Sequence, residues 1–378
     1  MVNNERAQQI TILGLMTGSS ADGLDLCLVR FTGQDRSPDF EVLYSNEIPY
    51  PDSFQKSFRD PLQLNDDQIA RLDAELGIWF AEEIEKLNLD FDFIASHGQT
   101  IKHEPPHFSL QIGNPEDMSA RFNCPVVYDF RTADIDQGGQ GAPLIPIVDQ
   151  YLLRQEDSDI LSLNIGGIAN ISIVPGNDNS SPVLAWDTGP GNTLIDKAVR
   201  LYTNNRLAFD RDGQFASQGR VNPELLNELL KHEFYERTPP RSAGQEQFGD
   251  SYFHKTVKQF YPANEQAFKD LIHTFTLLTA KTVSSSIRSL ASNYSPSTLF
   301  ASGGGALNLT LMEMLKKEVP QITISDFEVS GVRAGNKEAF GFAYLGYLFT
   351  RRLTANLPSV TGAGKAVTLG KLCKPQTS

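Results

Sequence analysis

Hydroxyls, glycines and one carboxylate are concentrated between two short apolar runs near the start of the chain. The runs are Ile10–Met16 and Leu24–Phe31, and between them stand Thr17, Gly18, Ser19, Ser20, Ala21, Asp22 and Gly23. Glycines let backbone N–H groups approach a ligand, hydroxyls donate to phosphate oxygens, and a carboxylate can hold hydrated Mg²⁺. The pattern suits a phosphate-binding hairpin. By composition alone an ordinary hairpin with a polar turn ranks first, because such turns are common.

Polar side chains also follow two later predicted strands, Phe91–Ala95 and the strand beginning at Val126. Ligands of open α/β sheets lie beyond the carboxyl ends of strands, where these side chains fall. His97 follows the first strand directly, and a ligand contact and a satisfied structural role are equally supported. Arg131 follows the second and offers a planar donor fork for a carboxylate or phosphate. Its alternative role is a salt bridge with Asp129 or Asp134.

A single aspartate in the second half has the setting of a general base. Asp187 follows a short predicted strand and precedes a Gly-Pro-Gly bend. A carboxylate in that place could take a proton from a sugar hydroxyl or from water. In isolation an Asx turn or a helix-start cap is the favoured alternative.

A glycine triplet, Gly303, Gly304 and Gly305, separates a predicted strand, Thr298–Ala301, from a helix that begins at Leu309. Such a turn lets a flat ring lie against the backbone, and a helix N-terminus favours phosphate; a mere tight turn is the alternative. Glu338 opens a predicted helix that ends near Arg352, where an acid could simply complement the helix dipole.

The two halves of the chain begin alike, which predicts a duplicated architecture closing on one nucleotide. Ile160–Val174 is again strand, glycine turn and strand. At 378 residues two domains are expected. We place them at residues 1–145 and 155–335, with 336–378 packing back on the first. Amphipathic spacing predicts a helix after Asn65 that runs to Leu87, and a longer helix at about Leu271–Ala291.

Composition narrows the possible partners. The formal net charge of -13 argues against nucleic acid and anionic membrane surfaces. No apolar run has the length of a membrane span, and the N-terminus lacks a signal-peptide pattern. Three cysteines, Cys27, Cys124 and Cys373, form no Cys-x-x-Cys pair. A reducing cytoplasm, without a disulfide framework or zinc site, is the simplest expectation.

Several motifs in order resemble the anhydro-N-acetylmuramic acid kinase family. The opening stretch Gly-Leu-Met-Thr-Gly-Ser-Ser-Ala-Asp-Gly-Leu-Asp differs from the usual signature at Thr17 and Ser19, which keep a hydroxyl, and at Ala21. The other matches are Ser-His-Gly-Gln-Thr, Asp-Phe-Arg, Gly-Gly-Gln-Gly-Ala-Pro, Asp-Thr-Gly-Pro-Gly-Asn, Pro-Pro-Arg-Ser-Ala-Gly-Gln-Glu-Gln-Phe-Gly, Gly-Gly-Gly-Ala-Leu-Asn and a closing motif at Asn356–Ala363. In the Pro-Pro-Arg stretch, Arg241 keeps a charge while Ala243 and Gln245 depart from the pattern.

The resemblance implies an α/β, two-domain, duplicated fold of the sugar kinase, heat-shock ATPase and actin type, with a nucleotide cleft between the domains. It implies ATP and Mg²⁺ as cofactors and 1,6-anhydro-N-acetylmuramic acid as substrate. Water opens the anhydro ring and O6 takes the γ-phosphoryl group, giving N-acetylmuramic acid 6-phosphate and ADP in peptidoglycan recycling. A kinase for another anhydrosugar such as levoglucosan, or a non-catalytic sugar- or nucleotide-binding protein, is the alternative. A homodimer is left open.

The resemblance also assigns roles to residues. Asp187 is the catalytic base, and Asp22 is the expected metal contact. The substrate residues are His97, Gln99, Arg131 and Glu338, with Arg131 facing the sugar or its carboxylate. The expected nucleotide-binding residues are Gly18, Ser19, Ser20, Ala21, Asp22, Gly23, Leu24, Asp25, Asn164, Gly166, Gly167, Asn170, Gly303, Gly304, Gly305 and Asn308.

Overall fold

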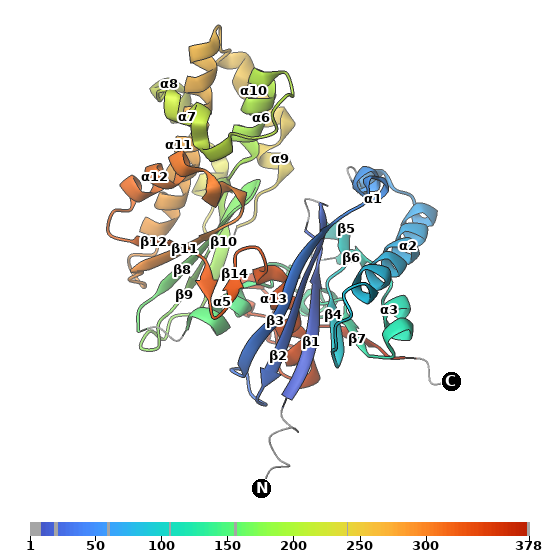
Figure 1. Cartoon of the computed structure of the whole chain (residues 1–378). Coiled ribbons are helices and arrows are strands. Elements are labelled where there is room, and N and C mark those ends of the chain that lie inside the picture. Colours follow the sequence, from blue (N-terminus) through green and yellow to red (C-terminus); the bar gives the residue numbers. More distant parts are fainter. Residues whose placement is uncertain are drawn as a thin grey trace. The chain divides into compact units, whose positions relative to one another are not determined.

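The structure is a computed structural model that describes residues 9–18, 22–58, 61–105, 107–154, 157–239 and 241–375 (Figure 1). The chain divides into two compact units. The first combines Met1–Tyr151 with Glu328–Ser378, and the second is Leu152–Phe327. The first unit is therefore made from both ends of the sequence, while the second is continuous.

The first unit is built on a six-stranded sheet with the order β15-β7-β4-β1-β2-β3. Strands β1, β2 and β3 form an antiparallel meander, whereas β4 runs parallel to β1 and β7 parallel to β4. The short β15 adds antiparallel to β7 from the C-terminal end of the chain. The strands are β1 (Gln9–Met16), β2 (Gly23–Thr32), β3 (Asp39–Pro49), β4 (Phe93–Ser96), β7 (Val126–Tyr128) and β15 (Lys371–Cys373).

The second unit repeats this plan in a five-stranded sheet with the order β10-β9-β8-β11-β12. Again three antiparallel strands are followed by two parallel ones. The strands are β8 (Ile160–Ile165), β9 (Ile168–Val174), β10 (Leu184–Pro190), β11 (Thr298–Ser302) and β12 (Thr323–Asp326). The predicted duplication is thus confirmed at the level of topology, because the same strand order and direction occur twice.

Helix α13 (Lys337–Thr350) covers one face of the first sheet and explains why Gly14 has no side chain. A Cβ on Gly14 would overlap the carbonyl oxygen of Ala339, so strand and helix pack backbone to backbone. Phe31 of β2 contacts Tyr347 of α13, with ring centroids 4.9 Å apart.

Helix α2 (Asp66–Glu85) begins with a capping box between Asn65 and Gln68. The remaining elements of this unit are α1 (Asp52–Ser57), η2 (Pro61–Gln63), β5 (Gln99–Glu104), β6 (Phe108–Ile112), α3 (Pro115–Phe122), α4 (Thr132–Ile135), β13 (Glu328–Val329), β14 (Val332–Arg333) and α14 (Pro358–Thr361), and α5 (Pro146–Leu153) leads into the second unit.

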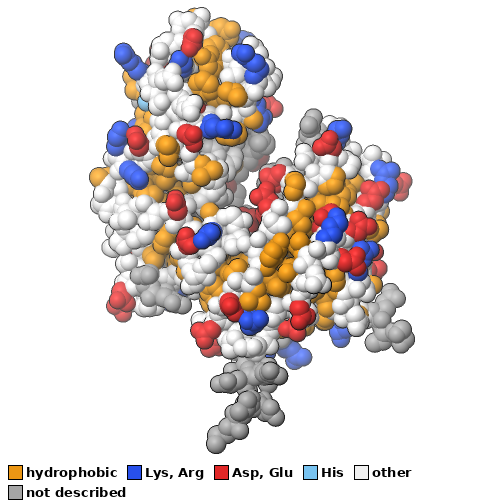
Figure 2. Space-filling view, viewed as in Figure 1, with side chains coloured by type: hydrophobic (Ala, Val, Ile, Leu, Met, Phe, Trp, Pro, Cys, Tyr) orange, Lys and Arg blue, Asp and Glu red, His pale blue; other side chains and the backbone are white. Residues whose placement is uncertain are grey.

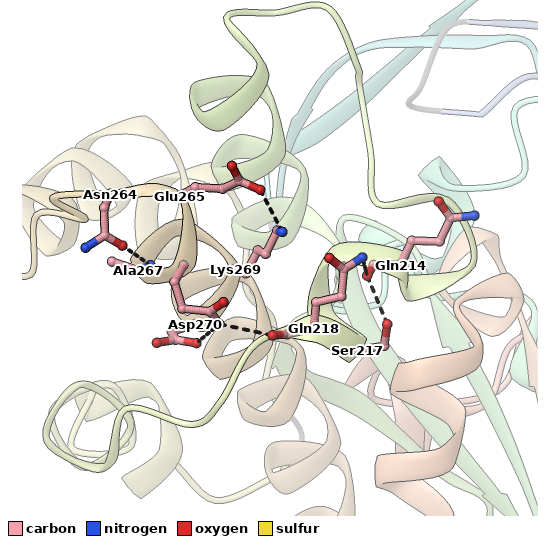
Figure 3. Close-up of polar contacts among 9 residues, drawn as sticks. Gln214, Ser217, Gln218, Asn264, Glu265, Ala267, Lys269 and Asp270 are labelled. Atoms are coloured by element: carbon pink, nitrogen blue, oxygen red, sulfur yellow. Dashed lines mark hydrogen bonds and ion pairs between the residues drawn. The ribbon is translucent and has the colours of Figure 1, made fainter.

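Helix α11 (Glu265–Ser289) is the long helix of the second unit and begins six residues before the predicted start at Leu271. Asn264 accepts a hydrogen bond from the backbone N–H of Ala267, 3.0 Å away, and caps the helix (Figure 3). Lys269 pairs with Glu265 one turn earlier at 2.7 Å. The first turns are polar and therefore carry no hydrophobic period. The other helices are α6 (Thr193–Thr203), η3 (Arg211–Gly213), α7 (Gln214–Gln218), α8 (Pro223–Leu229), η4 (Glu233–Glu236), α9 (Gln245–Phe248), α10 (Asp250–Gln259), η5 (Gly304–Leu307) and α12 (Leu309–Glu318).

Charged side chains of both signs lie on the surface (Figure 2). On the face drawn in Figure 2, basic side chains lie interspersed with acidic ones over both units. Among the described residues, no helix is both long and apolar enough to cross a membrane. Cys27 and Cys124 are buried and unbridged, and Cys373 is a free thiol on β15.

Candidate active site

The turn between β1 and β2 forms the tip of this hairpin, and the Gln99 side chain supports it through a hydrogen bond. Ser19, Ser20 and Ala21 lie outside the described residues. The Gln99 side chain is buried, donates through Nε2 to the carbonyl oxygen of Gly18 at 3.2 Å, and accepts from the Tyr50 hydroxyl at 3.3 Å. The backbone N–H of Tyr50 donates to the carbonyl oxygen of Asp22 at 2.8 Å. Gln99, expected to contact substrate, therefore anchors the tip, and Tyr50 is a residue that sequence reasoning missed.

Several carboxylates lie close to this tip. Asp25 lies directly opposite Glu47 in the β2–β3 ladder, so the two side chains share one face. Burial raises the pKa of Asp25 to about 7, with further contributions from the negative charges of Glu47, Asp22 and Glu338. Leu24 is fully buried, and a Cβ on Gly23 would come within 2.5 Å of the Ile48 carbonyl oxygen. Of the predicted residues from 22 to 25, Leu24 and Gly23 serve packing, and the exposed Asp22 and half-buried Asp25 carry the polar groups.

Arg131 is held by two acceptors of its own unit. Its Nη1 donates to the carbonyl oxygen of Gly141 at 2.8 Å, and its Nε donates to His97 Nε2 at 3.1 Å. The expected alternative, a salt bridge with Asp129 or Asp134, is wrong. Asp129 pairs with Lys371 at 2.7 Å instead, and Asp134 accepts from the backbone N–H of Gly141 at 2.8 Å.

His97 is a buried neutral partner of Arg131. Its side chain is 3% exposed, and its ring lies 4.6 Å from that of Phe342 between centroids. Burial, followed by the positive charge of Arg131, holds the His97 pKa well below its usual range. Because Nε2 accepts from Arg131, the neutral ring carries its proton on Nδ1. Its buried position suits the support of Arg131 better than direct contact with a ligand.

Glu338 lies in the first turn of α13 and is half-buried. Burial raises its pKa, and the charges of Lys337 and Arg131 oppose that rise. Burial in turn lowers the pKa of Arg131 to about 10, with Glu338 acting in the opposite direction. Arg131 is thus charged at neutral pH and is electrostatically coupled to Glu338. The structure brings the predicted substrate residues His97, Arg131 and Glu338 into one cluster.

In the second unit, four polar residues form a row across neighbouring strands. Ser302 of β11 pairs with Asn164 of β8, Asn164 with Asn170 of β9, and Asn170 with Asp187 of β10. The Ser302 hydroxyl donates to the carbonyl oxygen of Leu163 at 3.1 Å. Cross-strand partners present their side chains on the same face. Sequence reasoning did not foresee Ser302, because its place in the row depends on the pairing of β11 with β8.

Asp187 stands in strand β10 beside a bulge, so the Asx-turn and helix-cap alternatives are wrong. Its Oδ2 accepts from the backbone N–H of Ala243 at 2.7 Å. Arg241 donates to the Asp187 backbone carbonyl at 3.2 Å and to the carbonyl oxygen of Arg237 at 2.8 Å, fixing the segment that supplies Ala243. Burial raises the pKa of Asp187 to about 6, opposed first by the Ala243 hydrogen bond. The site thus holds a half-buried carboxylate that is ionised at neutral pH.

The β8–β9 tip and the glycine triplet pack against each other. The carbonyl oxygens of Gly166 and Gly167 accept from Asn192 and Gly191 N–H groups, both at 2.8 Å. Gly303 has φ of +80°, and a Cβ there would come within 2.6 Å of Asn164 Oδ1. A Cβ on Gly305 would overlap the side chain of Ile165, whereas a Cβ on Gly304 would make only an ordinary contact, 3.8 Å from Asn192 Nδ2.

Asn308 also has a clear local role. Its Oδ1 accepts from the backbone N–H of Leu311 at 3.0 Å and caps α12. The side chain is buried. The local contacts of this expected nucleotide residue therefore fix the start of the helix that follows the glycine triplet.

A small cavity of about 240 Å³ lies within the first unit, and His97 is one of the residues that line it. It is lined by Ser96, Gly98, Gln111 and Tyr128 among others, and β5 and β6 form one wall. Sequence analysis did not predict this hairpin. The pairing of Gln99 with Ile112 is what places it beside the β4 end.

Two copies of one α/β sheet plan, each with a glycine-containing turn after its first strand, define the class of sugar kinases, heat-shock ATPases and actin. Within that class, the family model described as anhydro-N-acetylmuramic acid kinase matches residues 10–375. The chain belongs to this family, and the resemblance noted from the sequence motifs is confirmed.

Curated relatives of the same description match over nearly their whole length. A protein of Caldanaerobacter subterraneus subsp. tengcongensis is 38% identical over 381 residues, covering 96% of each chain. One from Shewanella amazonensis is 36% identical, covering 96% of this chain and 98% of its own. One from Crocosphaera subtropica is 35% identical, covering 97% and 99%. Among solved structures, an ADPNP-bound dehydratase activator from Clostridium difficile has a TM-score of 0.43 and 11% identity, covering 90% of this chain and 97% of its own.

Proposed function

We propose that the protein is an ATP-dependent kinase that opens 1,6-anhydro-N-acetylmuramic acid with water and phosphorylates O6. The products are N-acetylmuramic acid 6-phosphate and ADP, and the reaction belongs to peptidoglycan recycling. The family match from residue 10 to residue 375 carries this proposal. The half-buried carboxylate of Asp187, fixed by the Ala243 hydrogen bond, supports it from within the molecule, because the reaction needs a base that is ionised at neutral pH.

Asp187 would act on the attacking water. The water oxygen bonds to the anomeric carbon while one of its protons passes to a carboxylate oxygen of Asp187. The C1–O6 bond breaks, and O6 keeps its electron pair and attacks the γ-phosphorus of ATP. Because the leaving oxygen is also the phosphoryl acceptor, no separate acid is required. A hydrogen bond from Ala243 to Oδ2 supports this role by leaving Oδ1 of Asp187 as the oxygen for the water proton.

We assign the nucleotide contacts to the two hairpin tips and the glycine triplet. The described residues of these turns are Gly18 and Asp22 to Asp25 in the first unit, and Gly166, Gly167 and Gly303 to Gly305 in the second. Backbone N–H groups in such glycine-rich turns suit phosphate and ribose oxygens. Mg²⁺ keeps several waters and binds through one or two carboxylates plus nucleotide phosphates. Among the described residues no three His, Cys, Asp or Glu side chains form a metal cage. Asp22 fits a contact to a phosphate-bound ion, which would neutralise charge on the phosphoryl group.

We assign the sugar's lactyl carboxylate to Arg131. Arg131 is charged and positioned by Gly141 and His97, and a guanidinium facing a carboxylate makes strong charge-assisted hydrogen bonds. Glu338, coupled to the same guanidinium, is the proposed acceptor for a sugar hydroxyl or amide. We also propose that the two compact units serve as the two functional domains, with the C-terminal segment belonging to the first.

Turnover in ¹⁸O-labelled water tests the reaction directly. The protein is incubated with ATP and either 1,6-anhydro-N-acetylmuramic acid or levoglucosan, and the products are analysed by mass spectrometry. We expect the muramyl product to carry one ¹⁸O on the sugar and none in the phosphoryl group. A faster reaction with levoglucosan would identify a kinase for another anhydrosugar. Binding of both ligands without turnover would identify a non-catalytic protein.

The setting of the protein follows from this assignment. A kinase that uses ATP works where ATP is available, and we propose the cytoplasm. Fractionation of cells that express the tagged chain tests this location. Light scattering on the purified protein decides between the monomer and the homodimer that the sequence leaves open.

A further inference from the structure

Two sequence motifs without an assigned role meet at one buried carboxylate, that of Asp134. The glycine-rich motif at Gly138–Pro143 and the closing motif at Asn356–Ala363 are more than two hundred residues apart. Asp134 Oδ1 accepts from Asn356 Nδ2 at 2.6 Å and from the Thr361 hydroxyl at 2.7 Å. Its Oδ2 accepts from the backbone N–H of Gly141 at 2.8 Å. Asp134 is 0% exposed, so these bonds carry much of the solvation of its carboxylate.

The two motifs also bind each other through their backbones. The N–H of Gln140 donates to the Thr361 carbonyl at 2.9 Å, and the N–H of Gly364 donates to the Gln137 carbonyl at 2.8 Å. A Cβ on Gly139 would overlap the Asp134 carboxylate, and Gly141 has φ of +66°. The glycines let the loop close tightly around Asp134. The loop therefore has one well-defined position, which the closing motif determines.

The position of this loop affects Arg131, because Gly141 of the loop also contacts the Arg131 side chain. The same residue that gives its N–H to Asp134 offers its carbonyl oxygen to Arg131 Nη1. His97 holds the guanidinium from the other side through Arg131 Nε. A continuous chain of hydrogen bonds thus runs from Thr361 and Asn356 through Asp134 and Gly141 to Arg131.

We propose that Thr361 and Asn356 are positioning residues that fix the Arg131 guanidinium for its ligand by way of Asp134 and Gly141. The inference rests on the proposed function only in taking the substrate carboxylate as the ligand of Arg131. Loss of the Thr361 hydroxyl leaves the buried Asp134 carboxylate short of one donor, so the loop shifts and Arg131 loses its fixed acceptor. Substrate affinity falls while the step at Asp187, in the second unit, is unaffected.

Steady-state kinetics of Thr361→Val test this proposal. We expect the KM for 1,6-anhydro-N-acetylmuramic acid to rise by about tenfold, within the range of coupling seen for residues in one hydrogen-bond network. We expect kcat to stay within about twofold, because the chemistry at Asp187 is unchanged. Thr361→Ser keeps the hydroxyl and restores the KM. Ser217→Ala, which removes an exposed hydroxyl from α7 of the second unit, is the matched control with no effect on KM.

A double-mutant cycle separates positioning from general structural damage. In an Arg131→Ala background, Thr361→Val should cause no further rise in KM, because the group that it positions is already absent. An equal rise in both backgrounds overturns the proposal. If Thr361→Val fails to fold, Thr361→Ala serves, since it removes the hydroxyl and adds no methyl group.

A sugar-free readout keeps this inference distinct from the proposed function. The ¹⁵N–¹H signal of Arg131 Nε, assigned by its absence in Arg131→Lys, reports the hydrogen bond to His97. We expect Thr361→Val to move this signal and to accelerate its exchange with water. An unchanged signal overturns the inference whatever the substrate is. A moved signal in a protein that does not phosphorylate the sugar would refute the proposed function alone.

Discussion

At the scale of single residues, two side chains carry most of the proposed chemistry, and their surroundings differ. Asp187 is a carboxylate whose burial raises its pKa to about 6, and its main hydrogen bond comes from a backbone N–H. Arg131 is a cation held by a carbonyl oxygen and a neutral imidazole. Neither side chain has its charge cancelled by a salt bridge within the described residues. Both charges are therefore available to a ligand.

Asp187→Asn should abolish most turnover while the fold persists. The amide cannot take the water's proton but can still accept the Ala243 hydrogen bond, so we expect kcat to fall by about 100- to 10,000-fold. The same substitution also changes how stability depends on pH. The folded-state pKa of Asp187 lies above the unfolded value of 3.8, so the cost of ionising this half-buried carboxyl group lowers the stability of the parent as pH rises from 3.8 through about 6. At pH 7.5 the variant should therefore melt no lower than the parent.

Two measurements check this prediction, a steady-state assay and a thermal melt of the same preparation. Turnover within a few-fold of the parent would remove Asp187 from the role of base. The parent's kcat should also fall as pH drops through about 6, because the protonated carboxyl cannot accept a proton. A pH profile that stays flat down to pH 5 would contradict the assignment even with the variant inactive.

Arg131→Ala should discriminate between sugars. Only the muramyl substrate carries a carboxylate that the guanidinium could bind. The KM for the muramyl substrate should therefore rise far more than the KM for levoglucosan. Truncating a charged partner typically costs about 2 to 5 kcal/mol when the contact is buried. Steady-state kinetics with both sugars provide the measurement. Equal effects on the two sugars would indicate that Arg131 serves structure or phosphate instead.

At the scale of elements, neighbouring segments of each unit hold the two hairpin tips that we assign to the nucleotide. In the second unit the tip carbonyls of Gly166 and Gly167 already accept bonds from the segment before α6. In the first unit, Gln99 and Tyr50 support the tip from the core side. Hydrogen bonds thus hold the described residues of both tips, and for the proposed phosphate ligand this would lower the entropy lost on binding.

Gly18→Val tests the first tip. A branched side chain there would occupy space that phosphate oxygens need, and β-branching restricts the turn. We expect the affinity for magnesium-ATP to fall by at least about tenfold, the scale of one lost hydrogen bond to a charged group. Calorimetric titration of the folded variant is the measurement, with Thr32→Val at the far end of β2 as a control. Unchanged affinity would place the nucleotide elsewhere.

At the scale of the whole molecule, the first unit depends on both ends of the chain. The face of β1 and β2 that carries Phe31 is covered by α13, and β15 completes the sheet. The second unit has its core within Leu152–Phe327, where the sheet residues and α11 pack together. We infer that its folding needs no segment from outside that range.

We accordingly expect fragment 152–327 to melt cooperatively on its own, and fragment 1–151 to be unfolded or aggregated. The reason is the apolar area of β1 and β2 that loses its cover. Circular dichroism melts of the two fragments provide the measurement. Joining 328–378 to 1–151 through a flexible linker should restore a cooperative transition. A well-folded 1–151 fragment would contradict the dependence on α13.

Local patterns in the sequence determined the elements and the family of this protein. Apolar runs located β1, β2, β8 and β9, and Asn65 located the start of α2, because strand burial and helix capping depend on neighbouring residues. The motif order identified the kinase family. Asp187 was placed after a strand and before a bend, and the structure puts it within β10 at a bulge.

The hydrogen-bond partners of the site residues depend on the tertiary structure and could not be predicted from local sequence. His97 beside Arg131, Gln99 behind Gly18, and Thr361 at Asp134 are contacts between residues 34 to 227 positions apart. Strand order and sheet register bring such residues together, and neither is encoded in any one segment. The polar row from Ser302 to Asp187 arises in the same way, because it exists only when four strands pair in one register.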